Sequence, residues 1–86
     1  MSYQATLRSN IIVELRRHKD DLDGFIEDMM TPQEIEALDE RIKIMHALSA
    51  GKTQREIAEE LELSITTVSR GSRILQYGRI KGGWRK

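Results

Sequence analysis

Side chains that can donate hydrogen bonds gather in one short stretch of this 86-residue sequence, at Thr66, Thr67, Ser69, Arg70 and Arg73. In the major groove of DNA, arginine pairs with guanine, and a hydroxyl group serves either base type. A set of such groups reads bases only if one rigid element presents them together. The stretch therefore predicts a DNA-reading helix.

Two helix start signals define that element. Thr53 and Glu56 have the spacing of a capping box, in which each side chain binds the other residue's backbone amide. Ser64 is a second N-cap, for a helix that begins at Ile65. Only residues 62–64 remain for the connection, so the pattern predicts a helix-turn-helix.

The formal net charge of zero hides a strong asymmetry. All fourteen acidic residues lie at or before Glu62, where only eight lysines and arginines accompany them, which gives a charge of −6. The remainder carries no acid and a charge of +6, from Arg70, Arg73, Arg79, Lys81, Arg85 and Lys86. This basic end suits contact with phosphate. The alternative is a solvated basic tail.

Composition excludes several classes of protein. Without cysteine there is no disulfide and no thiolate metal site, and we expect no metal site of any kind. His18 and His46 are the only histidines, and the carboxylates show no acid–base arrangement, so we expect no enzyme. No apolar run reaches the roughly 18 residues that span a bilayer, and no signal peptide is evident. We expect a cytoplasmic protein without a membrane partner.

Two amphipathic segments precede the central part of the chain. Within residues 1–19, Leu7, Ile11 and Leu15 recur at helical spacing. Acidic residues and Gly24 then interrupt the pattern before a second short apolar segment. A chain of 86 residues forms only a marginal core alone. We therefore expect both segments to pack against a second copy of the chain.

The central helix has the clearest boundaries. Thr31, Pro32 and Glu34 form a capping box with proline at the first helical position, and Gly51 suits a left-handed stop after Ala50. We expect an all-α fold and a single domain of residues 1–86. Its parts are dimerisation helices at 1–30, a central helix at 31–51, a helix-turn-helix at 53–77 and a basic tail at 78–86.

Several of these segments together resemble the tryptophan repressor family. They are Met-Thr-Pro-Gln-Glu-Ile-Glu-Ala-Leu at 30–38, Arg41, Thr-Gln-Arg-Glu-Ile at 53–57 and Ile-Thr-Thr-Val-Ser-Arg-Gly-Ser at 65–72. The resemblance implies an intertwined homodimer that represses transcription by binding a palindromic DNA operator. It also implies L-tryptophan, or a related effector, as corepressor.

The same resemblance implies which residues meet DNA. It places Ile65, Thr66 and Ser69 against base edges and Arg55 at the DNA from the preceding helix. We assign the basic residues Arg70, Arg73, Arg79 and Lys81 to DNA as well, the last three to phosphates. Alternatively, Ile65 could be a core residue, and Thr66 and Ser69 could be ordinary solvated residues.

An effector pocket is implied as well. Arg41 and Arg70 match the pair that sandwiches the indole, and Thr31, Thr67 and Gly71 match other pocket positions. Two positions depart from the family pattern, since Ile74 replaces a serine that binds the ligand and Asp28 replaces a leucine. Asp28 could bind the ligand's ammonium group or pair with Arg41. The alternatives are a DNA-binding regulator without an effector and, less favoured, a helical module for protein contact.

Overall fold

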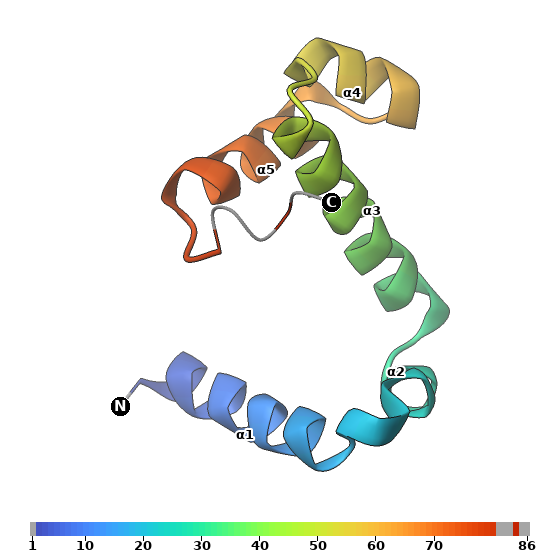
Figure 1. The fold of residues 1–86 in the computed structure, drawn as a ribbon, viewed down its shortest axis with the longest axis vertical. Helices are drawn as coiled ribbons and strands as arrows, with labels where there is room; N and C mark the ends of the chain where they lie inside the picture. Colours follow the sequence, from blue (N-terminus) through green and yellow to red (C-terminus); the bar gives the residue numbers. More distant parts are fainter. Residues whose placement is uncertain (1, 81–83, 85–86) are drawn as a thin grey trace. The chain divides into compact units, whose positions relative to one another are not determined.

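Five α-helices make up the computed structural model, which describes residues 2–80 and Trp84 (Figure 1). They are α1 (Tyr3–Arg17), α2 (Leu22–Met29), α3 (Pro32–Ser49), α4 (Gln54–Leu61) and α5 (Ile65–Tyr77), with a 3-10 turn, η1 (Lys19–Asp21), before α2. The described residues contain no strand, so the prediction of an all-α fold is confirmed. None of their helices combines the length and the apolar character needed to cross a membrane. The chain divides into two compact units, Met1–Ile35 and Glu36–Lys86.

Local side-chain caps start both helices of the N-terminal unit. Ser2 Oγ accepts the Ala5 amide at 3.1 Å, and the Asp21 carboxylate accepts the Gly24 amide at 3.0 Å. The predicted interruption between the two amphipathic segments therefore extended too far toward the C-terminus. Because Asp21 is the N-cap, Asp23 and Gly24 form the first turn of α2.

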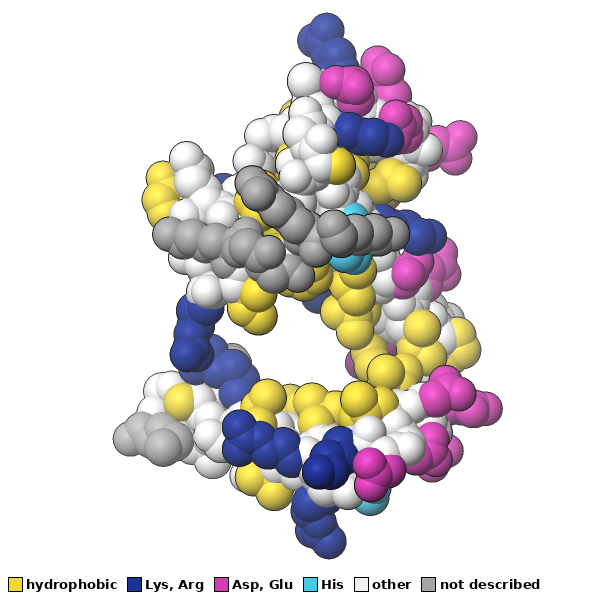
Figure 2. Space-filling view, viewed as in Figure 1, with side chains coloured by type: hydrophobic (Ala, Val, Ile, Leu, Met, Phe, Trp, Pro, Cys, Tyr) yellow, Lys and Arg dark blue, Asp and Glu magenta, His cyan; other side chains and the backbone are white. Residues whose placement is uncertain are grey.

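No residue of α1 or α2 is buried. Figure 2 shows hydrophobic side chains exposed along this unit. The exposed ones are Tyr3, Leu7, Ile11, Ile12, Val13, Leu22, Ile26 and Met29. The unit thus leaves uncovered the apolar stripes that were expected to pack against a second copy.

The start of α3 confirms the predicted capping box. The Thr31 amide donates to Glu34 Oε1 at 2.9 Å, and the Glu34 amide donates to Thr31 Oγ1 at 3.2 Å. The hydrogen bonds from the Thr31 backbone and side chain lower the pKa of Glu34 below its ordinary value of 4.5.

The end of α3 is a Schellman motif. Gly51 has a φ of +91°, its amide donates to the Leu48 carbonyl at 3.0 Å, and the Lys52 amide donates to the Ala47 carbonyl at 3.2 Å. The helix ends at Ser49, one residue before the predicted end. The left-handed glycine is confirmed.

The C-terminal unit encloses a core of its own. Ile44 from α3, Ile57 and Ala58 from α4, and Val68 from α5 form one buried cluster. Partly buried apolar residues surround it, namely Ala47, Leu48, Leu61 and Leu63. Ala58 and Val68 are thus buried where α4 and α5 cross, and Leu63 of the turn packs against them.

Gly71 is the point at which the backbone of α5 lies directly against side chains of α3. A Cβ atom at this position would lie 2.5 Å from Ile44 Cγ2 and 3.4 Å from Leu48 Cδ1. Real Cβ contacts are longer than the first of these distances. Glycine therefore sets how tightly α5 packs on α3.

Beyond the end of α5, Trp84 contacts α3. Gly78 ends the helix as predicted. Trp84 lies against α3, where its carbonyl oxygen is 2.8 Å from His46 Nδ1 and its ring meets the imidazole edge-to-face at 6.2 Å. Residues 81–83 of the predicted basic tail lie outside the described residues.

Candidate nucleic-acid interface

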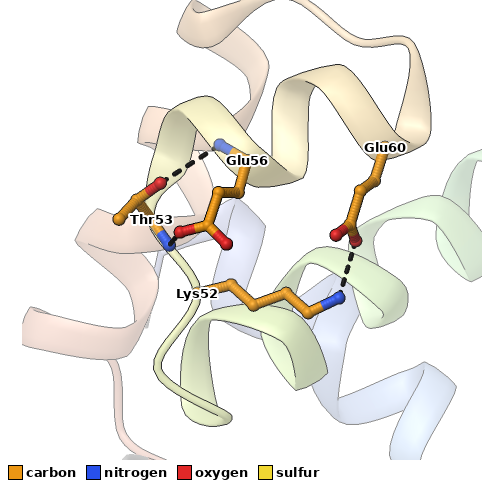
Figure 3. Close-up of polar contacts among 4 residues, drawn as sticks. All are labelled: Lys52, Thr53, Glu56 and Glu60. Carbon is orange, nitrogen blue, oxygen red and sulfur yellow. Dashed lines mark hydrogen bonds and ion pairs between the residues drawn. The ribbon is translucent and has the colours of Figure 1, made fainter.

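The first helix of the motif is fixed at its start by the predicted capping box (Figure 3). Thr53 Oγ1 accepts the Glu56 amide at 3.1 Å, and Glu56 Oε1 accepts the Thr53 amide at 3.2 Å. An ion pair of 2.6 Å between Lys52 Nζ and Glu60 Oε2 ties the residue before this cap to the second turn of α4. The orientation of α4 relative to the end of α3 is therefore held by local contacts.

The turn between α4 and α5 depends on a left-handed residue that sequence reasoning missed. Glu62 has a φ of 57° and a ψ of 45°. Its amide donates to the Glu59 carbonyl at 3.4 Å, and the Leu63 amide donates to the Ala58 carbonyl at 2.9 Å. Glycine or asparagine usually occupies such a position, so a glutamate gave no signal.

The start of α5 is capped as predicted. Ser64 Oγ accepts the Thr67 amide at 3.1 Å. The two hydroxyl oxygens of Ser64 and Thr67 also lie 2.8 Å apart, in hydrogen-bond contact. The Thr67 hydroxyl thus contributes to the cap of its own helix.

The three predicted base readers lie together on the first turns of α5 but differ in environment. The Ile65 side chain is half exposed, at 50%, which does not match the alternative of a core position. Thr66 is exposed. Ser69 is partly buried, and its hydroxyl donates to Gln54 Oε1 at 2.6 Å. Gln54, which the sequence did not single out, therefore belongs to this interface because it orients one of its hydroxyl groups.

Four of the predicted DNA-contacting cations are exposed, namely Arg55, Arg70, Arg73 and Arg79. The ion pairs within the described residues use other cations, namely Arg17, His18, Lys43 and Lys52. The four guanidinium groups therefore have no carboxylate partner there. Lys81, the fifth predicted cation, lies outside the described residues.

The residues predicted to bind an effector do not share one environment. Thr31 belongs to the N-terminal unit and caps α3, whereas Arg41 and Arg70 are exposed in the C-terminal unit. Arg41 forms no ion pair with the described residues of its own unit. The inner side of Gly71 faces Ile44, Leu48 and Met45 at contact distance.

A surface cavity of about 590 Å³ lies between the end of α3 and α4. Its lining consists of Lys43, His46, Ala47, Ser49, Ala50, Lys52, Glu60 and Leu61. None of the predicted effector residues lines this cavity. Among the described residues, no group of three or more histidine, cysteine or acidic side chains is arranged to hold a metal ion.

Comparison with known proteins gives consistent matches to one family. The family model for the Trp repressor protein matches residues 9–81. A Trp operon repressor homolog from Xylella fastidiosa (strain M23) is 40% identical over 68 residues, covering 78% of this chain and 74% of that protein. The Trp operon repressor homolog of Vibrio cholerae is 45% identical over 49 residues, 56% of this chain and 48% of its own length. The uncharacterized Bacillus subtilis protein YerC is 37% identical over 54 residues, 63% of this chain and 52% of its own length. No solved structure gave a significant match.

Proposed function

Because the chain belongs to the Trp repressor family, we propose that it is a sequence-specific DNA-binding regulator that represses transcription. The family consists of non-enzymatic regulators, which agrees with the expectation that the chain is not an enzyme. Within the proposal, Ile65, Thr66 and Ser69 contact base edges, and Arg55 reaches DNA from α4.

The observation that carries the proposal is the set of exposed arginines around a capped α5. An arginine that is already paired with a carboxylate must give up that partner before it can bind phosphate. Arg70, Arg73 and Arg79 have no such partner in the described residues, so their full charge is available to DNA. Phosphate contacts would position α5, and the side chains of its first turns would specify the sequence.

We propose further that the chain acts as a homodimer on a palindromic operator. The N-terminal unit supports this, because its helices bury no residue within their own chain. A two-fold dimer would present two copies of α5 to successive major grooves, about 34 Å apart. A protein-contact module is less well supported, since such a face is usually enriched in aromatic residues and the first three turns of α5 contain none. Their exposed side chains are Ile65, Thr66, Arg70, Arg73 and Ile74.

Selection from random double-stranded DNA tests the proposal. The wild-type protein should enrich a palindromic site. Arg70→Ala and Thr66→Ala should lower affinity for that site, by about tenfold where a hydrogen bond to a charged group is lost. Arg17→Ala is a matched control, because Arg17 is an exposed arginine of α1 that pairs with Glu14. Failure to enrich any sequence would contradict the proposal.

Two observations favour DNA binding without an effector. Gly71, which matches a position of the family's pocket, packs directly against Ile44 and Leu48 of α3. Ile74, at the position where the family pattern has a ligand-binding serine, offers no hydrogen bond. We therefore propose that the regulator binds its operator without L-tryptophan.

Calorimetry distinguishes the two forms of regulation. We expect no heat when L-tryptophan is titrated into the protein, and the same gel shift with and without it. Heat of binding together with tighter DNA binding would show that L-tryptophan is a corepressor after all. In that case Arg41→Ala should abolish the heat.

A further inference from the structure

Ser69 and Gln54 form the one side-chain hydrogen bond between α4 and α5 among the described residues. Ser69 Oγ donates to Gln54 Oε1 at 2.6 Å, across 15 positions of sequence. Both residues are partly buried. The contact therefore lies at the edge of the core, with one side toward the solvent where DNA is proposed to bind.

The positions of both groups are fixed by their neighbours. Gln54 is the first residue of α4, directly after the Thr53 cap. Ser69 follows Val68, whose side chain has no exposed surface, and Ile57 on α4 is likewise completely buried. Neither helix can shift without disturbing this packing, so the hydrogen bond has little freedom to rearrange.

A serine hydroxyl has one hydrogen and two acceptor lone pairs. In this structure Gln54 takes the hydrogen, which leaves Ser69 with lone pairs only. In the major groove, adenine presents its N6 amino group and cytosine its N4 amino group as donors, whereas guanine O6 and thymine O4 are acceptors. An acceptor-only hydroxyl discriminates between these two classes of base edge.

We propose that Gln54 is a positioning residue that makes Ser69 a reader of base amino groups, on adenine or cytosine. The inference rests on the proposed function, because it assumes that α5 enters the major groove. Gln54 thereby takes part in sequence specificity. Ser69 acts toward the base only as a hydrogen-bond acceptor, whereas a free hydroxyl could either donate or accept.

The reverse arrangement has a different consequence. If the Gln54 amide were turned so that its nitrogen donated to Ser69, the serine hydrogen would be free for guanine O6 or thymine O4. The base preference at the position that depends on Ser69 therefore reports which group holds the hydrogen.

The test selects sites from random double-stranded DNA with the wild type and with Ser69→Ala, Gln54→Met and Gln54→Glu. The wild type should show, at one position per half-site, a base preference that depends on Ser69. Ser69→Ala and Gln54→Met should lose that preference, by about three- to tenfold for a neutral hydrogen bond. Gln54→Glu should keep it, since its carboxylate still accepts the hydrogen bond from Ser69. The overall affinity of this variant for DNA should fall, because the phosphates repel the added negative charge.

A base analogue provides a second readout that a structural role would not affect. Replacing the preferred base by one that lacks its amino group should weaken wild-type binding about three- to tenfold. It should leave Ser69→Ala unchanged, because that variant has no hydroxyl to accept from the amino group. Melting curves establish that each variant is folded.

The outcomes separate the inference from the proposed function. If the wild type selects DNA but binds the base analogue without the amino group as tightly as the preferred base, or if Gln54→Met keeps the wild-type preference, the inference is wrong and the proposed function stands. If the wild type selects no DNA sequence, the proposed function is wrong and the inference falls with it.

Discussion

The two units of the chain differ in how far they bury their own apolar side chains. In Glu36–Lys86, three helices enclose Ile57 and Val68 completely. In Met1–Ile35, two helices leave their apolar side chains exposed. The C-terminal unit has a buried core of its own, and the N-terminal unit has no buried residue in either of its helices.

This difference separates two tasks. A helix that reads DNA must be held rigidly, and the buried cluster around α4 and α5 provides that rigidity within one chain. Short isolated helices are marginal in water, so α1 and α2 gain stability only when their apolar faces are covered. The proposed homodimer would cover them and would also set the distance between the two reading helices.

The largest effect is expected from a charge on the exposed apolar face of α1. Ile11→Glu should weaken the dimer at least about a hundredfold, because the change occurs twice per dimer and each isoleucine contributes about 2 kcal/mol of burial. Sedimentation velocity measures the change. Ser9→Glu, which adds the same charge two residues away on the same helix, is the control. Equal association of Ile11→Glu and wild type would show that this face is not the interface.

A smaller but still clear effect is expected at Gly71, where α5 packs against Ile44 of α3. Gly71→Ala should lower the free energy of unfolding by about 1–3 kcal/mol, because the new methyl group overlaps Ile44. Thermal or urea unfolding measures it. Gln76→Ala, at an exposed position of the same helix, should be nearly neutral. A neutral Gly71→Ala would mean that α3 and α5 are packed less tightly than the structure indicates.

Substitutions at the two left-handed residues, Gly51 and Glu62, should change the stability of the protein in opposite directions. Gly51→Ala should destabilise the protein by about 1 kcal/mol, since its φ of +91° is strained for alanine although no atom lies within 4 Å of the added Cβ. Glu62→Gly should stabilise it by up to about 1 kcal/mol by relieving the left-handed glutamate. Differential scanning calorimetry measures both. A loss of stability in Glu62→Gly would contradict this account of the turn.

The smallest effect concerns pH and the start of α3. Because folding lowers the pKa of Glu34, its contribution to stability is complete above the ordinary pKa of 4.5 and is lost as pH falls through the lowered folded value. Unfolding of the wild type and of Glu34→Gln should therefore converge in acid and diverge slightly toward neutral pH. If the free energies of unfolding of wild type and Glu34→Gln differed by the same amount at all pH values, the ionisation of Glu34 would not be the cause.

The helix boundaries were predictable where a side chain binds the backbone a few residues away. Thr31, Thr53 and Ser64 each start a helix as predicted, because their hydroxyl groups satisfy amides within the first turn. Gly51 ends α3 for an equally local reason. The error around Asp23 and Gly24 arose because several acidic residues near a glycine suggest a loop when the cap at Asp21 is not identified.

Features that depend on distant contacts were not accessible from spacing alone. The bond between Gln54 and Ser69 crosses from one helix to the next, and the contact of Gly71 with Ile44 spans two helices. The left-handed Glu62 is imposed by the packing of Leu63 and Ala58 on either side of the turn. The assignment of individual residues to DNA or to an effector came from the family resemblance and stays a prediction.

The central claim is that the exposed arginines of the C-terminal unit bind DNA phosphates, and its most direct test is the salt dependence of binding to the selected site. With Arg73, Arg79 and Lys81 of each protomer on phosphates, a dimer makes six such contacts. The logarithm of the association constant should then fall against the logarithm of salt concentration with a slope of about −5, and Arg73→Ala should make the slope shallower by about two. Binding that does not change with salt, or an identical slope in Arg73→Ala, would contradict the claim.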